Sequence, residues 1–106
     1  MINKNDKVKL NYYDNDSRRY IELPKKIDVY THIEVKDKVL SLLKETDKSI
    51  VLDMKRMPTI ESSGVSVIVT VQKLLENDNR KLYLTNVNDS IREVMEYCKV
   101  PYKVVS

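Results

Sequence analysis

The pattern of hydrophobic and polar positions at the start of the chain predicts a β-hairpin. Residues 7–12 and 19–23 are short runs with strand-like composition. Between them, residues 14–17 read Asp-Asn-Asp-Ser, whose side chains can hydrogen-bond the backbone of a turn. We therefore expect two antiparallel strands here.

A helix and a buried strand are expected next. Apolar side chains recur at intervals of three and four between residues 31 and 44, which is the spacing of a helix packed on a sheet. Thr31 and Glu34 have the spacing of a capping box, in which each side chain binds a free amide at the start of the helix. Residues 49–54 then contain a continuous apolar run, which is typical of a central strand.

The last third of the chain predicts a strand, a helix and a final strand. Residues 81–84 have strand composition, and Asn88 is a good first residue for the helix that follows. The apolar face of this helix ends at Cys98, so we expect Cys98 in the core. Pro101 ends the helix, and residues 102–105 can close the chain as a strand.

Residues 65–71 are ambiguous because two periodicities overlap. Valine alternates with other residues, and β-branched side chains favour strands. The segment nevertheless continues to Glu76 without a turn signal, and Val67, Val71 and Leu75 lie on one helical stripe. We therefore predict a helix and expect packing on the sheet to outweigh the strand propensity of valine.

These elements make the chain an α/β protein with the order β-β-α-β-α-β-α-β. We expect a mixed sheet of about five strands with about three helices packed on it. A chain of 106 residues can form one hydrophobic core but not two, so residues 1–106 are expected to be a single domain. One cysteine, Cys98, and one histidine, His32, exclude a disulfide framework and an ordinary zinc site, so neither a metal nor a cofactor is expected.

The charged residues argue against nucleic-acid and membrane partners. The net charge of +3 comes from 19 basic and 16 acidic residues spread along the chain, so no basic strip follows a phosphate backbone. The basic pairs at residues 18–19 and 25–26 are interpreted as a solvated hairpin edge. Apolar runs are too short to cross a bilayer, and the first residues lack the apolar stretch of a signal peptide. We therefore expect a soluble cytoplasmic protein without direct nucleic-acid binding or membrane insertion.

Gly64 is the only glycine, and the segment that contains it has the composition of a functional site. Residues 57–64 connect the central strand to the ambiguous helix and end in Glu61-Ser62-Ser63-Gly64. Ser62 would lie at the helix start, where its hydroxyl is exposed. Gly64 has no side chain and would leave room for a partner's backbone to approach. The same residues are also those of an ordinary helix cap.

The whole chain resembles the STAS domain of anti-sigma factor antagonists, the small regulatory phosphoproteins of bacterial partner-switching systems. The element order and the buried strand that ends at Asp53 carry part of the likeness. Glu61 to Gly64 stand in place of the family's Asp-Ser-Ser/Thr-Gly, and residues 23–28 stand in place of its Leu-x-Gly-x-Leu-Asp. The chain departs from the pattern at Glu61, where the family has Asp, and at Lys25, where it has Gly.

The resemblance implies a protein-binding switch. In the family, a partner kinase, often the anti-sigma factor itself, phosphorylates the first serine after the acidic residue, and a serine phosphatase later removes the phosphate. That serine is Ser62 here, with Ser63 as the second candidate. The unphosphorylated form would bind the anti-sigma factor and so release the sigma factor, and the phosphorylated form would let go. Asp28 lies where family members contact partners, although a turn or helix-start role suits it equally. The residues expected to contact the partner are Asp28, Glu61, Ser62, Ser63, Gly64 and Val65.

Two alternatives are weighed against this switch. Serine hydrolysis needs a base, but His32 lies within the expected capping box, and one glycine cannot build a phosphate-binding loop, so no enzyme activity is expected. The second alternative is a scaffolding STAS module of a stress-signalling assembly or a transporter, which would differ from the switch only in lacking phosphorylation. The sequence does not distinguish the two. The chain is expected to be a monomer or a weak dimer.

Overall fold

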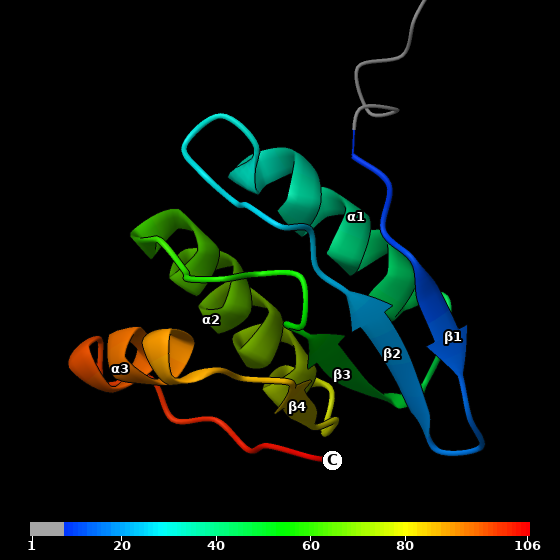
Figure 1. Ribbon diagram of the computed structural model, residues 1–106. Coiled ribbons are helices and arrows are strands. Elements are labelled where there is room, and N and C mark those ends of the chain that lie inside the picture. The colour runs from blue at the N-terminus through cyan, green and yellow to red at the C-terminus, as the bar shows by residue number, and fades with distance from the viewer. Residues whose placement is uncertain (1–7) are drawn as a thin grey trace, which may run out of the picture.

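The computed structural model describes residues 8–106 and has a four-stranded sheet with three helices on one side (Figure 1). The element order β-β-α-β-α-β-α confirms the predicted α/β class. The expected last strand is wrong: within the described residues, Val104 makes a single isolated bridge to Leu84. Two backbone hydrogen bonds to Leu84 hold this segment beside the sheet edge, which is too few for a fifth strand.

The predicted hairpin is present and forms the outer pair of strands. Strand β1 (Tyr12–Asp14) pairs antiparallel with β2 (Arg18–Glu22). Asn15 closes the turn, because its side-chain oxygen accepts hydrogen bonds from two turn amides at 3.0 and 2.8 Å. The first strand is shorter than predicted and lies further along the chain: β1 shares only Tyr12 with the predicted 7–12 and includes Asp14, which was expected in the turn. Residue 7 itself is not among those described.

The remaining strands run parallel to β2. Strand β3 (Ser49–Asp53) pairs with β2 and with β4 (Leu82–Thr85), in the order β1-β2-β3-β4. Leu52 of β3 lies between Ile21 and Leu84 in the register and is fully buried, as expected for a central strand. The C-terminal ends of these parallel strands meet at one end of the sheet, and the loops that follow them carry the candidate site.

The three helices lie at the predicted places, as α1 (His32–Lys44), α2 (Ser62–Asn77) and α3 (Asp89–Tyr97). Their buried side chains join the inward side chains of the strands in a single cluster, so all three helices cover the same face of the sheet. One-sided cover follows from two parallel crossovers of the same hand that run in the same direction across the sheet. The helical members of this cluster include Val35, Val39, Val67, Val71, Leu75, Ile91 and Met95.

Helix α2 resolves the ambiguous valine segment as predicted. A valine costs a helix roughly 0.5 kcal/mol relative to alanine, but burying its side chain gains about 2 kcal/mol. Val65, Val67, Ile68 and Val71 are all buried against the sheet and α1. The gain from burial therefore outweighs the loss of propensity.

Cys98 is exposed, so its expected place in the core is wrong. Helix α3 ends one residue earlier, and Cys98 is its C-terminal cap. The next residue, Lys99, has a φ of 57°, which turns the chain away from the helix axis. The buried face of α3 therefore rests on Ile91 and Met95.

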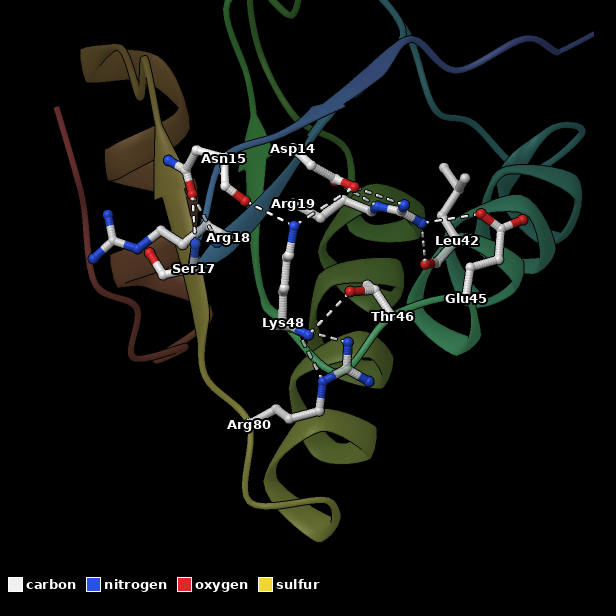
Figure 2. Close-up of polar contacts among 10 residues, drawn as sticks. All are labelled: Asp14, Asn15, Ser17, Arg18, Arg19, Leu42, Glu45, Thr46, Lys48 and Arg80. Carbon is white, nitrogen blue, oxygen red and sulfur yellow. Dashed lines mark hydrogen bonds and ion pairs between the residues drawn. The ribbon is translucent and has the colours of Figure 1, made fainter.

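Arg19 is buried, with 7% of its surface exposed, which corrects its interpretation as part of a solvated edge. Figure 2 shows its guanidinium directed at Asp14 and at the C-terminal end of α1. It donates two hydrogen bonds to Asp14, at 2.7 and 2.9 Å, and one each to Glu45 and the carbonyl of Leu42, at 3.0 and 2.9 Å. Arg19 therefore ties the hairpin to α1.

The face of the sheet opposite the helices is closed by its own side chains. Val51 has no exposed surface, although it lies outside the cluster packed under the helices. Its neighbours in the register are Tyr20 and Tyr83. Tyr13 stacks on Tyr20 with ring centres 4.8 Å apart, and Arg18 lies over Tyr83 at 4.5 Å. This face therefore covers its apolar centre without a partner.

Candidate functional site

The segment between β3 and α2 is held by three buried apolar side chains, those of Met54, Met57 and Ile60. It ends at Glu61, which is extended, with φ −94° and ψ 167°, and precedes the first turn of α2. Both Glu61 and Ser62 are exposed. The buried anchors thus fix the path of the segment and leave the helix start at the surface.

The two serines differ in their surroundings. Ser62 is the first residue of α2 and is exposed, whereas Ser63 is half-buried. The Ser63 hydroxyl donates a hydrogen bond to the carbonyl of Ile27 at 3.2 Å. Within the described chain, Glu61 makes no side-chain capping bond to the first turn of α2. Ser62 is therefore the accessible hydroxyl, and Ser63 joins α2 to the segment before α1.

Gly64 is buried rather than open to a partner, which corrects the interpretation of its missing side chain. A Cβ atom at this position would lie 2.8 Å from Cγ1 of Ile60, closer than real contacts allow. Val65 is also buried, with its side chain in the core cluster. Gly64 is therefore needed here because Ile60 occupies the space that a side chain would take.

Asp28 organises the turn into α1 by accepting hydrogen bonds from the amides of Tyr30 at 2.9 Å and Thr31 at 3.1 Å. The bond from the Tyr30 amide, with those from Thr31 and the nearby charge of Lys26, holds the pKa of the Asp28 carboxyl below its usual range. The predicted capping box is wrong: Thr31 makes no capping bond, and Glu34 instead accepts from the amide of Val8 at 3.1 Å. Asp28 caps the preceding turn instead, because its carboxylate accepts from the amides two and three residues further along the chain.

Asn88 is a site residue whose second role the sequence pattern did not reveal. Its side-chain oxygen caps α3 by accepting from the amide of Ile91 at 2.9 Å, as predicted for a helix start. Its amide nitrogen donates to the carbonyls of Met57 and Pro58 at 3.2 and 3.1 Å. Asn88 therefore fastens the segment that leads to Ser62, a contact that spans some thirty residues of chain and leaves no local pattern.

We expect Asn88→Asp to loosen the segment before Ser62 while keeping the α3 cap. The carboxylate still accepts from Ile91, but it offers no donor to the carbonyls of Met57 and Pro58. The free energy of unfolding should fall by about 1 kcal/mol. Hydrogen exchange should quicken in residues 55–61 and stay unchanged in α3. Faster exchange in α3 alone would contradict this role.

The described residues contain no group of three or more His, Cys, Asp or Glu side chains arranged to hold a metal ion. No helix within residues 8–106 is long and apolar enough to cross a membrane.

Similarity to solved structures agrees with this architecture. The chain is 20% identical to a proposed anti-sigma factor antagonist from Thermotoga maritima, with a TM-score of 0.81 over 92% of this chain and 86% of that one. It is 12% identical to a variant of RsbS from Moorella thermoacetica, with a TM-score of 0.78 over 92% and 86% of the two chains. At such identities the likeness is one of fold.

The anti-sigma factor antagonist SpoIIAA of Bacillus is similar in both its phosphorylation states. The unphosphorylated form is 16% identical, with a TM-score of 0.71 over 92% of this chain and 88% of that one. The phosphorylated form has a TM-score of 0.68 at 16% identity over 92% of each chain. A family model for the STAS domain matches residues 9–104 and confirms the resemblance expected from the residues. The chain belongs to the STAS domain family.

Proposed function

We propose that this chain is an anti-sigma factor antagonist, a cytoplasmic, non-enzymatic switch controlled by phosphorylation of Ser62. In this proposal the unphosphorylated form binds an anti-sigma factor with serine kinase activity. Phosphorylation by that partner ends the binding, and a serine phosphatase restores it. The residues in or beside the contact would be Asp28, Glu61, Ser62 and Ser63. Gly64 and Val65 are buried and would hold the start of α2 in place.

The observation that carries the proposal is the exposure of Ser62 at the first position of α2. Its hydroxyl is accessible, while the neighbouring Ser63 hydroxyl is committed to Ile27. The first amides of a helix lack intrahelical partners, and Glu61 does not cap them within the described chain. A phosphate on Ser62 would therefore meet free amides and the positive end of the helix, so the fold should tolerate it.

The same phosphate would oppose binding. It adds about −1.5 to −2 charges at neutral pH, and it would do so beside the exposed carboxylate of Glu61. In a closed interface both negative charges would be desolvated next to each other, and the free-energy cost of this exceeds what contacts at the surface contribute to binding. The switch would thus act through the charge of the surface and leave the core intact.

Fold and family both support this function. The similar structures include one described as an anti-sigma factor antagonist in unphosphorylated and phosphorylated forms. Both forms match this chain with comparable scores, which agrees with a modification that leaves the fold in place. The segment Glu61 to Gly64 occupies the strand-to-helix position that the resemblance assigns to the phosphorylated signature.

We expect incubation with ATP and its anti-sigma factor kinase to add one phosphate, at Ser62. Intact-mass measurement and peptide mapping would count and place the group. Ser62→Ala should prevent the reaction and keep binding, and Ser63→Ala serves as the matched control that is still modified. Ser62→Asp should weaken kinase binding by about a hundredfold, since like charges at an interface cost several kcal/mol.

Two results would count against the switch. Phosphate that maps away from Ser62 would contradict the assignment of the site. Equal affinity of the kinase for Ser62→Asp and for the unmodified protein would contradict the mechanism. A partner without kinase activity, such as a transporter, would favour the scaffolding alternative.

A further inference from the structure

Strand β1 has one free edge. In the part of the chain that the structure describes, β1 pairs only with β2 and is the outermost strand of the sheet (Figure 1). The carbonyl of Asn11 accepts a hydrogen bond from the amide of Glu22. Because backbone groups alternate between the two sides of an antiparallel strand, those of Tyr12 and Asp14 point away from β2. They therefore present donors and acceptors to a further strand.

The free edge of β1 lacks the usual protection of an edge strand. Proteins commonly block such an edge with a proline, a bulge or a charge directed along it. β1 contains no proline, and its register with β2 runs without a bulge. The carboxylate of Asp14 is held by two hydrogen bonds from Arg19. The edge is therefore open to strand addition.

Helix α1 lies beside the same edge. Residues 9–11 line a surface hollow of about 420 Å³ together with Lys38, Ser41 and Leu42. These three residues and Glu45, the C-cap of α1, follow the spacing of three and four that places side chains on one face of a helix. The four are called the α1 edge face below. A strand added to β1 would also meet this face.

The strand and the α1 edge face are aligned. The hollow places residues 9–11 beside the first part of the edge face. Arg19 donates hydrogen bonds both to Asp14 and to Glu45, the last residue of that face. Tyr12 lies between these two contact points along the strand, so it is level with the middle of the edge face.

A two-fold axis beside Tyr12 would make both the strand and the helix complementary to themselves. The β1 strands of two copies would run antiparallel, with the outward groups of Tyr12 opposite their own copies and those of Asp14 opposite Leu10. The same axis would pass the middle of the α1 edge face, so Lys38 of each copy would meet Glu45 of the other. The two Lys38 residues would stay roughly 10 Å apart along the helix direction, because a helix rises 1.5 Å per residue.

The side chains at this edge have the composition of an interface. Leu10 and Leu42 are half-buried, and Tyr12 is 48% exposed, so an apolar centre surrounds the proposed axis. Glu45 can take a further contact, because its side chain is 55% exposed and Arg19 binds only Oε1. An apolar centre with a charged rim is typical of the interface between two proteins.

We propose that the free edge of β1 and the α1 edge face bind a second copy of this chain, in a two-fold dimer whose two sheets join into one. Charge complementarity favours this occupant. A strand of an unrelated protein could satisfy the backbone of β1, but the second copy also brings a carboxylate to Lys38 and an ammonium group to Glu45. One two-fold axis explains both contacts.

The dimer does not depend on the proposed function. Helix α1 contacts α2 on one side and lines the hollow with residues 9–11 on the other. The free edge is therefore separated by α1 from the helix that begins at Ser62. Both copies would keep the Ser62 hydroxyl accessible.

Sedimentation of the full chain at increasing concentration tests the dimer and should show a reversible equilibrium between monomer and dimer. Tyr12→Pro removes an amide that points out of the sheet, which an edge strand tolerates. It should raise the dissociation constant of the dimer by about tenfold or more. Tyr12→Val is the matched control, because it also removes the ring but keeps the amide and favours a strand. Equal losses for the two variants would contradict the strand pairing.

Charge reversal tests the helix contact. Lys38→Glu would place two carboxylates against each other twice in the dimer, so it should raise the dissociation constant by about tenfold at low salt and by less at high salt. Lys73→Glu makes the same change on the exposed side of α2 and should leave the dimer unchanged. Equal weakening by the two variants would show a general effect of net charge and contradict the contact with Glu45.

Distances between spin labels locate the axis. In a Cys98→Ser background, labels attached at Ser41→Cys should lie closer together in the dimer than labels attached at Ser66→Cys. Ser41 lies in the middle of the α1 edge face, whereas Ser66 is exposed on α2. Circular dichroism should show that all variants are folded.

Three results would overturn the proposal. The first is a chain that stays monomeric at every concentration. The second is a dimer that Tyr12→Pro and Lys38→Glu leave intact, or in which the labels on Ser66→Cys are the closer pair, because the copies would then meet through another face. The third is a monomeric chain whose binding to another protein is weakened by Tyr12→Pro but not by Tyr12→Val, because the edge would then take a strand of that partner.

Discussion

Replacement of Gly64 by valine is expected to lower the free energy of unfolding by about 3 kcal/mol. A Cβ atom there would lie 2.8 Å from Cγ1 and 3.3 Å from Cδ1 of Ile60, and 3.7 Å from Cβ of Ile27. Ile60 is buried and cannot swing into solvent, so the added methyl groups must displace packed atoms. Urea denaturation, with its midpoint and slope, measures the loss.

Two alanine variants identify the cause of this loss. Alanine favours a helix over glycine by about 1 kcal/mol, but in the original protein Gly64→Ala should still destabilise because its Cβ meets Ile60. In an Ile60→Ala background the crowding atoms are gone, and the same substitution should stabilise. If Gly64→Val stays stable and loses only partner binding, the crowding by Ile60 is contradicted. The interpretation from the sequence, that Gly64 leaves room for a partner's backbone, would then be correct.

Arg19→Ala is expected to cost a similar amount, about 3 kcal/mol of the free energy of unfolding. The substitution removes a buried stem and leaves the Leu42 carbonyl and the carboxylates of Asp14 and Glu45 without their donor. The loss stays at the low end for a broken buried ion pair, because both carboxylates are partly exposed to water. Urea or thermal unfolding would measure it.

Arg18 supplies the control for Arg19, since it lies next in sequence but on the opposite face, over Tyr83. Arg18→Ala should lower the free energy of unfolding by about 1 kcal/mol or less. Equal losses at the two positions would contradict the role of Arg19 in joining the hairpin to α1.

The pH dependence of stability offers a second readout. The hydrogen bond from Arg19 holds the pKa of Asp14 below its usual range, so its stabilising effect is present above the unfolded pKa and is lost as the pH falls. Arg19→Ala should lack that part of the acid sensitivity.

The proposed switch relies on a division of roles within four consecutive residues. Ser62 faces solvent, Ser63 bonds to Ile27, and Gly64 lies under Ile60. A modification of the first residue need not disturb the contacts of the next two. This arrangement separates the charge that would control binding from the packing that maintains the fold.

The secondary structure was largely predictable because burial on one face imposes a local period. Apolar spacing marked residues 31–44 and 91–98 as helical, and a continuous apolar run marked residues 49–54 as a strand. Residues 65–71 carried both periods, and the length of the uninterrupted segment indicated the helix that the structure contains. The prediction of the last strand was wrong because composition does not show how many backbone hydrogen bonds a segment will form with the sheet edge.

The candidate site divides in the same way. The exposed serine at the start of α2 followed from sequence, because the strand, the apolar run and the Glu-Ser-Ser-Gly segment are contiguous. The tertiary structure alone decided that Ile60 fills the space over Gly64, that the Asp28 carboxylate caps the turn before α1, and that Asn88 holds the segment before Ser62. It also decided that Arg19 is buried. The Arg19 and Asn88 contacts join residues far apart in the chain, and the geometry at Gly64 and Asp28 depends on how the folded segments pack. A periodic pattern records which side of an element is buried but not which atom it meets there.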